Sequence, residues 1–369
     1  MNQKICFFNR SSIHYRKNIY LLLDREMGVD FYFGDSRPGN IAPFDSSLLS
    51  RPAQKLHNIN IGPFYWQQGL LKLLVSKYTD FISPCDTHNL SVWIFMLLSR
   101  FFKKNVYMWT HGAYGNEGFI KKIMRMLQIK ASKGAFLYGQ YAKDILIGWG
   151  INPSKLHVIY NSLDYDKQME VRKEMIDSGI YSSHFHNNNK NIIFIGRLTK
   201  VKKLHQLLYA MVELAQKGNF YNVTFIGDGS EKQNLLNLAE ELKLSNNAWF
   251  FGACYDEKQI SEFIYNADIC VSPGNVGLTA MHAMVFGTPV ISHDNFPMQM
   301  PEFEAIIDGK TGTFFKEDNV NSLADSIQRW FDIQQNRETI RNNCFNVIHE
   351  KYNPYKQIET FKNVILKQK

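Results

Sequence analysis

An arginine and a lysine follow one strand-like segment of the second half of the chain at a spacing that suits a diphosphate. The apolar run before Gly196 ends at that glycine, Arg197 comes next, and Lys202 lies where a helix is expected to begin. Arginine offers a planar fork of N–H donors and lysine a compact charge, so the pair could neutralise a diphosphate at the rim of a cleft. Ordinary surface basicity is the alternative interpretation of both residues.

Two glycine-containing turns after expected strands could bring the backbone close to a ligand. Gly227 lies in the first, an Ile-Gly-Asp-Gly turn. The second leads through a Pro-Gly turn into a helix that is expected to begin near Gly277 and to end at Gly287, so its first amides could hold a phosphate. His282 lies one to two turns inside this helix. The alternatives are a turn that needs glycine for its own geometry and a hydrogen-bonded core histidine.

Other polar clusters indicate no metal site. Glu302 and Glu304, two residues apart and followed by Asp308-Gly309, could hydrogen-bond vicinal hydroxyl groups, or could be acids of an exposed loop. The histidines and asparagines at 184–189 favour a solvated linker over a metal site. The five cysteines are scattered without metal-ligand spacing, which predicts reduced thiols and a cytoplasmic protein.

Length and composition predict a globular protein of two to three domains. The chain has 369 residues, of which 45% are hydrophobic and 21% charged, and this balance argues against disorder, collagen and coiled coil. The longest uninterrupted apolar stretch, Val92 to Leu98, is far shorter than the roughly 20 residues of a membrane span. The start of the chain is expected not to be a signal peptide.

The positive charge is concentrated in the first half. Residues 1–165 hold 20 Lys and Arg against 10 Asp and Glu, whereas the whole chain has a net charge of +8. Much of this excess lies in two apolar and basic segments, 93–104 and 119–130. They could be ordinary surface helices, and together they favour contact with an anionic membrane surface. No nucleic-acid-binding motif is visible, so nucleic acid is not an expected partner.

Short apolar or aromatic runs alternate with helical stretches, which predicts parallel sheets wrapped by helices. We expect an α/β protein with two Rossmann-like domains that face a cleft, where ligands bind at the carboxyl ends of the strands. The expected domains are 1–165, a polar linker at 166–190, 191–350, and a last helix at 351–369 that crosses back to the first domain. First-half strands are expected at 4–9, 30–33, 80–84, 105–110, 135–138 and 157–160, with helices near 17–26, 66–78, 90–102, 118–131 and 140–149.

The ordered motifs of residues 190–335 resemble those of the retaining nucleotide-sugar glycosyltransferases of family 4, which have the GT-B fold. The motifs are Gly-Arg-Leu-x₃-Lys, Ile-Gly-Asp-Gly, Ala-Asp-x₃-Ser-Pro, Gly-Leu-Thr with Gly-Thr-Pro-Val-Ile, and Glu-x₇-Gly. The first half matches in layout, with weaker similarity at 109–112 and 161–164. The resemblance specifies fold and broad reaction but not which sugar is transferred.

The resemblance also implies roles for individual residues. Arg197 and Lys202 would hold the donor diphosphate and stabilise charge on the leaving nucleotide, and His111 would face the donor sugar. The sugar would be transferred with retention and without a metal ion or other cofactor, from a UDP- or GDP-linked donor. Further donor contacts would come from Gly196, Gly227, Asn275, Gly277, Leu278, Thr279, His282 and Glu304.

The chain departs from the family pattern at two positions. The family usually carries two glutamates eight residues apart around the Gly-Leu-Thr element, and here Gly274 and His282 stand in their places. The first change removes a carboxylate expected to bind sugar hydroxyls, and the second leaves a ring that could hydrogen-bond a ribose. An active subgroup with another donor sugar and an inactive enzyme are both open.

These features together predict a glycosyltransferase on the inner face of the plasma membrane. It would transfer a sugar to a lipid-diphosphate-linked saccharide in capsule or O-antigen (lipopolysaccharide) assembly. Arg10, His14 and Arg16, which follow the first expected strand, could contact the acceptor diphosphate. A sugar-nucleotide epimerase of similar fold and a catalytically silent partner subunit of a transferase are the alternatives.

Overall fold

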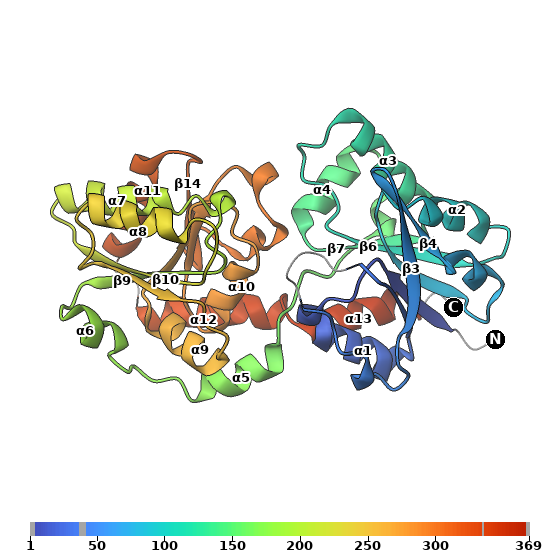
Figure 1. The fold of residues 1–369 in the computed structure, drawn as a ribbon, viewed down its shortest axis with the longest axis horizontal. Coiled ribbons are helices and arrows are strands. Elements are labelled where there is room, and N and C mark those ends of the chain that lie inside the picture. Colours follow the sequence, from blue (N-terminus) through green and yellow to red (C-terminus); the bar gives the residue numbers. More distant parts are fainter. Residues whose placement is uncertain (1–3, 37–41, 334–335, 367–369) are drawn as a thin grey trace. The chain divides into compact units, whose positions relative to one another are not determined.

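The computed structural model describes residues 4–36, 42–333 and 336–366, and these form two compact units. One unit comprises residues 1–164 together with 353–369, and the other comprises Tyr165–Tyr352. Each unit is built on its own sheet, flanked by helices (Figure 1). The mixed α/β class and the two Rossmann-like domains expected from the sequence are confirmed.

The first unit contains an eight-stranded sheet in the order β4-β3-β2-β1-β5-β6-β7-β8. All neighbouring strands are parallel except β3 and β4, which form an antiparallel hairpin. The strands are β1 (Ile5–Asn9), β2 (Asp30–Gly34), β3 (Gln54–Ile61), β4 (Phe64–Gln68), β5 (Asp80–Pro84), β6 (Asn105–Thr110), β7 (Gly134–Leu137) and β8 (Leu156–Val158).

Helices cover both faces of this sheet. They are α1 (Lys17–Met27), α2 (Leu90–Ser99), α3 (Phe119–Ala131), α4 (Gln140–Gly148) and α13 (Pro354–Ile365). Because successive strand residues point to opposite faces, Phe7 of β1 packs in the core that includes residues of α1 and α13, and Phe8 packs in the core that includes residues of α2 and α3. The strand is therefore buried on both sides, as a central parallel strand must be.

The second unit contains a six-stranded parallel sheet in the order β11-β10-β9-β12-β13-β14. Its strands are β9 (Lys190–Ile195), β10 (Tyr221–Ile226), β11 (Ala248–Gly252), β12 (Ile269–Ser272), β13 (Val290–His293) and β14 (Gly312–Phe315). Its helices are α5 (Tyr165–Lys173), α6 (Ile180–Phe185), α7 (His205–Gln216), α8 (Lys232–Glu241), α9 (Glu257–Asn266), α10 (Leu278–Val285), α11 (Val320–Asp332) and α12 (Arg337–Glu350).

The polar linker expected at 166–190 is instead part of the second unit. Helices α5 and α6 occupy much of it. Tyr181 is buried and donates a hydrogen bond from its hydroxyl to the carbonyl of Phe263 at 2.7 Å, and the ring of His184 stacks on Trp249 at 3.6 Å. Aromatic contacts therefore fix a segment whose composition alone indicated a solvated connection.

The helix expected near 66–78 is also wrong, because this segment begins as strand β4. Gly69 ends the strand with a φ of 93°, and a short 3-10 helix follows at Leu70–Val75. The strand was missed because it carries a buried polar residue. Gln67 donates to the carbonyl of Asn9 at 3.2 Å and accepts from Asn89 at 2.7 Å, so its amide is satisfied inside the unit.

The chain passes between the units at 164/165 and at 352/353, and each unit ties its two chain segments together near these points. In the second unit, the Tyr165 hydroxyl lies 2.9 Å from Nδ1 of His349. In the first unit, the Ser162 hydroxyl donates to the side-chain oxygen of Gln357 at 2.7 Å. The last helix, α13, packs on α1; residues 367–369 of the helix expected at the end of the chain lie outside the described residues.

Candidate functional site

Two glycine turns meet at the carboxyl ends of β9 and β10. The N–H of Gly196 donates to the carbonyl of Ile226 at 3.0 Å. Gly227 has a φ of 146°, and a Cβ atom there would lie only 1.9 Å from the carbonyl oxygen of Gly196. Only glycine allows this backbone-to-backbone approach. The turns thus leave an edge of backbone groups without side chains at the end of the sheet where ligands of open α/β folds bind.

Helix α10 begins beside these turns. Its N-cap, Gly277, adopts φ 54° and ψ −148°, which favours glycine. The hydroxyl of Thr279 donates to the carbonyl of Ile195 at 2.9 Å and so fastens the first turn of α10 to the end of β9. The first N–H groups of a helix have no partner within it, so the amides of Leu278 and Thr279 could bind an anion.

Lys202 reaches the start of α10, and Arg197 lies close to it. Lys202 Nζ donates to the backbone carbonyl of Asn275 at 2.6 Å and to its side-chain oxygen at 2.9 Å. A Cβ atom at Gly277 would lie 4.0 Å from the same nitrogen. Burial lowers the pKa of Lys202 to about 8, partly opposed by the charge of Glu302 and assisted by that of Arg197. The Arg197 side chain is exposed and has no ion pair within the described ranges.

Gly274 occupies a position where no side chain fits. Its N–H donates to the carbonyl of Lys202 at 2.9 Å, and a Cβ atom would lie 2.0 Å from the carbonyl oxygen of Val201. The turn before α10 therefore packs directly on the backbone of residues 201–202. This contact explains why glycine stands here in place of the glutamate that the resemblance leads one to expect.

His282 joins three helices. Its Nε2 lies 3.0 Å from a carboxylate oxygen of Glu257 at the start of α9, and the same oxygen accepts from Gln168 of α5 at 3.1 Å. Burial raises the pKa of Glu257, but its contacts with His282 and Gln168 outweigh this effect, so the net pKa lies below its usual range. Sequence reasoning did not identify Glu257 or Gln168, which are distant from His282 in the chain. A contact of His282 with a ribose stays a prediction.

The two acids at 302 and 304 lie on a 3-10 helix, Pro301–Ala305, that packs against α10. Glu302 is buried, and its charge raises the pKa of Lys202. Glu304 is partly exposed on the same element. In the second unit, the two glycine turns, Lys202 and the 3-10 helix that carries Glu304 thus adjoin α10, whereas His282 contacts Glu257.

In the first unit, the structure brings Arg16 and His111 together, whereas the side chains of Arg10 and His14 have other neighbours. The Arg16 guanidinium carbon lies 5.7 Å from the centre of the Tyr138 ring, and the His111 ring centre lies 4.8 Å from the same ring. Arg10 instead stacks on Tyr65 at 4.3 Å. Nδ1 of His14 lies 3.2 Å from the carbonyl of Ala42.

His111 is a neutral ring at physiological pH. Burial lowers its pKa to about 4, and the charges of Arg16 and Arg125 act in the same direction. Arg125 has a partner of its own: it lies 2.5 Å from a carboxylate oxygen of Glu117, whose side chain is 1% exposed. His111 can therefore donate or accept a hydrogen bond but does not carry charge near pH 7.

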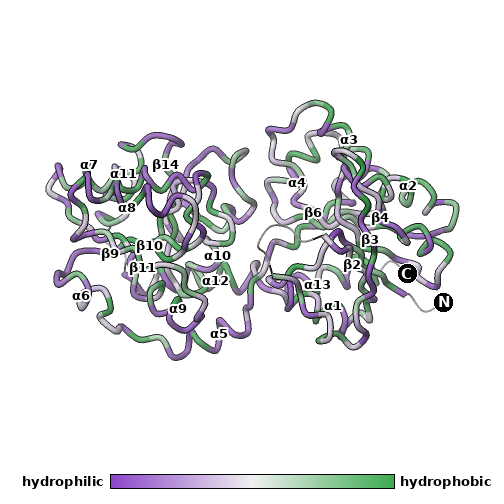
Figure 2. Tube along the Cα trace, viewed as in Figure 1, coloured by the Kyte–Doolittle hydropathy of each residue, from purple (hydrophilic) through white to green (hydrophobic). Residues whose placement is uncertain are grey.

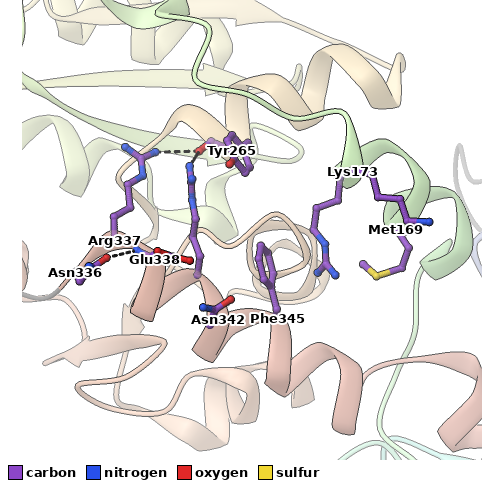
Figure 3. A pocket seen from close by; sticks show the side chains of 10 residues that line it. Met169, Lys173, Tyr265, Asn336, Arg337, Glu338, Asn342 and Phe345 are labelled. Atoms are coloured by element: carbon purple, nitrogen blue, oxygen red, sulfur yellow. Dashed lines mark hydrogen bonds between the residues drawn. The ribbon is translucent and has the colours of Figure 1, made fainter.

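A basic cavity of about 640 Å³ lies elsewhere in the second unit (Figure 3). Arg337 donates to the carbonyl of Tyr265 at 2.9 Å, and Arg341 donates to the same carbonyl at 2.7 Å. Arg172 donates to the carbonyl of Val285, the last residue of α10, at 3.2 Å. These arginines satisfy carbonyls at the C-terminal ends of α9 and α10, where positive charge is stabilising, so a structural role accounts for them.

Across the ranges that the structure describes, no group of three or more His, Cys, Asp and Glu side chains could hold a metal ion. Within the same ranges, no helix combines the length and the apolar character needed to cross a membrane.

The site lies in a segment that matches a known family. Residues 181–347 match the family model described as "Glycosyl transferases group 1". The match covers 167 of the 369 residues, just under half of the chain, and lies within the second unit. The matched segment contains the glycine turns, Arg197, Lys202 and α10.

Curated relatives resemble part of the chain. The capsular polysaccharide biosynthesis glycosyltransferase CapM of Staphylococcus aureus is 24% identical over 210 residues, which cover 54% of this chain and 53% of CapM. The O-antigen biosynthesis glycosyltransferase WclY of Escherichia coli is 29% identical over 166 residues, 42% of each chain. The matched segments thus span about half, or less, of these relatives.

Solved structures resemble the whole chain at low identity. Anabaena Alr3699/HepE in complex with UDP superposes with a TM-score of 0.71 and 16% identity, and the match covers 98% of this chain and 99% of HepE. The lipopolysaccharide outer core galactosyltransferase WaaB superposes with a TM-score of 0.72 and 15% identity over the full length of both chains. At such identity the likeness establishes the GT-B fold.

Proposed function

We propose that this protein is a retaining, hexosyl-type glycosyltransferase that uses a nucleoside-diphosphate sugar linked to UDP or GDP. The observation that carries the proposal is the convergence of Lys202, Arg197 and the first amides of α10 at the carboxyl edge of the second sheet. A diphosphate needs several N–H donors and positive charges held in place, and this edge supplies both. The bound UDP of the HepE structure supports the same class of ligand.

The chemistry follows from the charge that develops on the leaving nucleotide. As the bond between the sugar and the diphosphate breaks, negative charge grows on the diphosphate oxygens. Arg197, Lys202 and the α10 amides stabilise that charge, and loss of one such contact typically costs about 3–4 kcal/mol of transition-state stabilisation. His111 contacts the donor sugar as a neutral hydrogen-bonding group, and the reaction needs no metal ion or other cofactor.

The acceptor is a lipid-diphosphate-linked saccharide of capsule or O-antigen assembly. The printed functions of CapM and WclY support this class of pathway. Arg10, His14 and Arg16 belong to the segment after β1 and contact the acceptor in this proposal. The excess positive charge of residues 1–165 also favours an anionic substrate.

The protein works in the cytoplasm at the inner face of the plasma membrane. Helix α2 is hydrophobic over most of its length (Figure 2) and packs beside α3. Large apolar side chains are exposed on and next to these helices: Phe101 at 79%, Phe119 at 76% and Ile120 at 74%. Basic residues accompany them at Arg100, Lys103, Lys121 and Lys122. Exposed aromatics bordered by lysines suit an anionic lipid surface.

Donor turnover by the purified protein tests the activity. A panel of UDP- and GDP-sugars is incubated with lipid-linked acceptors, and transferred sugar and the anomeric configuration of the product are measured. Transfer is expected with one donor, and Arg197→Gln is expected to reduce kcat by at least about 100-fold. Transfer that persists in Arg197→Gln would overturn the diphosphate assignment.

The same assay separates the two rivals. An epimerase would interconvert the bound nucleotide sugar without any acceptor. A silent partner subunit would release no nucleotide with any donor and would raise the activity of another transferase; Gly274, which removes a family carboxylate, is the observation that favours it. Retention of Arg197, Lys202 and the glycine turns favours the active enzyme.

A further inference from the structure

Arg16 carries a positive charge that no acidic side chain offsets. It is the N-cap residue of α1, and its guanidinium carbon lies 5.0 Å from the Trp109 ring centre and 5.7 Å from that of Tyr138. Its Nε is buried without a hydrogen-bond partner, and Arg16 forms no ion pair with any described residue. The residues outside the described ranges include no Asp or Glu. An unpaired cation of this kind costs free energy unless a ligand neutralises it.

Two further polar groups beside Arg16 are also without partners. Nε1 of Trp109 and Nδ1 of His111 are both buried and make no hydrogen bond in the described chain. Trp109 belongs to the end of β6, and His111 follows that strand directly. The Tyr138 ring centre lies 4.8 Å from the ring of His111 and 6.3 Å from that of Trp109, so all three groups surround one aromatic ring.

None of the neighbouring groups can supply negative charge near neutral pH. The hydroxyl of Tyr20 interacts with Arg16, but burial raises its pKa, so it stays a neutral phenol. His111 is neutral as well. By contrast, Arg125 in the same unit has the buried carboxylate of Glu117. The cluster of Arg16, Trp109 and His111 thus offers one cation and further N–H groups, all at the carboxyl end of the sheet, where open α/β folds bind ligands.

We propose that Arg16, Trp109 and Nδ1 of His111 bind an oxyanion, a phosphate or a carboxylate, carried by the acceptor, and thereby select acidic acceptors; the other ring nitrogen of His111 is left for the donor sugar. This inference rests on the proposed transferase function. Arg10 and His14 are not part of this site. Arg10 stacks on Tyr65, and His14 lies at the carbonyl of Ala42. A neutral acceptor would leave the guanidinium unpaired and would be rejected, because an unmet buried charge is expensive.

The indole N–H signals test the site without any donor or acceptor. The chain has six tryptophans, so the full-length protein labelled with ¹⁵N-tryptophan gives six indole signals, and Trp109→Phe identifies the one from Trp109. The protein is titrated with inorganic phosphate, glucuronate and, as a neutral match, glucose, at constant ionic strength set with chloride. We expect saturable movement of the Trp109 signal with an oxyanion and none with glucose.

Variants show whether Arg16 provides the charge. Arg16→Met is expected to raise the dissociation constant of the oxyanion at least about tenfold, because the loss of one hydrogen bond between charged groups weakens binding by about this factor. Arg25→Met removes an exposed arginine of α1 and should change nothing, and Arg197→Gln should leave the Trp109 signal responsive. Arg16→Lys keeps the charge and provides a second variant if Arg16→Met does not fold.

The outcomes also separate the two sources of the oxyanion. Movement with phosphate alone indicates the phosphate that links the acceptor to its lipid, and movement with glucuronate indicates an acidic sugar residue. A Trp109 signal that responds to neither, or that responds equally in Arg16→Met, overturns the inference. The titration involves no sugar transfer, so its result is independent of the turnover assay. Anion binding can be absent in an active transferase, and it can be present in a protein that transfers no sugar.

Discussion

Lys202 Nζ donates to both oxygens of Asn275, at 2.6 Å to the backbone carbonyl and 2.9 Å to the side-chain amide. Neither oxygen carries a formal charge, so the hydrogen bonds of this partly buried lysine go to neutral acceptors. Burial therefore lowers its pKa to about 8. A diphosphate arriving at the start of α10 would add negative charge to that of Glu302, which already acts on this ammonium.

The affinity for a nucleoside diphosphate should depend on pH through Lys202. The lysine is a cation below about pH 8 and is progressively neutral above it, so binding should weaken as pH rises. We expect the dissociation constant of UDP or GDP to rise about fivefold between pH 8 and 9, because the charged fraction of Lys202 falls from about one half to about one tenth; calorimetry measures the change. Lys202→Arg, which stays charged, should give a flat profile. Parallel profiles for both proteins would contradict this role.

Gly274 should not tolerate any side chain. Gly274→Ala places a Cβ atom 2.0 Å from the carbonyl oxygen of Val201, so the turns must separate and Lys202 must move. We expect the free energy of unfolding to fall by about 1–3 kcal/mol, as measured by urea denaturation. Nucleotide binding should also weaken, as measured by calorimetry. Gly274→Glu should be at least as harmful. Gly148→Ala, where a Cβ meets nothing within 4 Å, is the control and should leave both quantities unchanged.

Removal of Arg16 should stabilise the protein rather than weaken it. Arg16→Met keeps an apolar stem on Trp109 and removes an unpaired charge, so we expect the free energy of unfolding to rise by about 1 kcal/mol. Arg125→Met removes the cation that pairs with the buried carboxylate of Glu117, which keeps its hydrogen bonds from two backbone N–H groups, and should cost about 3 kcal/mol. Urea titrations of both variants provide the comparison. Equal destabilisation would mean that Arg16 is structural.

Binding to anionic vesicles should depend on the exposed aromatics of the first unit. Replacing Phe101 and Phe119 together by serine should lower the partition coefficient at least about tenfold, because each ring loses its burial in lipid. Sedimentation with vesicles of anionic and of neutral lipid measures the effect. Phe220→Ser removes a ring that is 61% exposed in the second unit and serves as the control. Wild-type protein left in the supernatant at low salt would refute membrane binding.

The sequence predicted two central strands well, because each has an apolar centre between polar or proline ends. The bounds expected for 80–84 and 105–110 coincide with those of β5 and β6. The hairpin β3–β4 was missed because Gln67 is polar yet buried, with its amide satisfied by Asn9 and Asn89. Composition also misassigned 166–190, whose aromatic contacts with β11 and α9 depend on residues far away in the chain.

The candidate site was predictable where its parts are close in sequence. Gly277, Leu278 and Thr279 form one helix start, which glycine and spacing indicate directly. The tie between Lys202 and Asn275 joins residues 73 apart, and the isolation of Arg16 becomes visible only when β6, β7 and α1 are assembled. Sequence patterns identify which groups are present, but not which of them lack a counter-charge.

The paired ties at Tyr165–His349 and Ser162–Gln357 have a consequence for the history of the gene. Residues 165–352 form one uninterrupted stretch whose ends are held at neighbouring points, so this stretch could be exchanged as a cassette without rearranging the rest of the chain. If the proposed function is correct, recombination at 164/165 and 352/353 would combine a new donor-binding unit with an existing acceptor-binding unit. The positions 164/165 and 352/353 are therefore the natural joining points for building such hybrids in the laboratory.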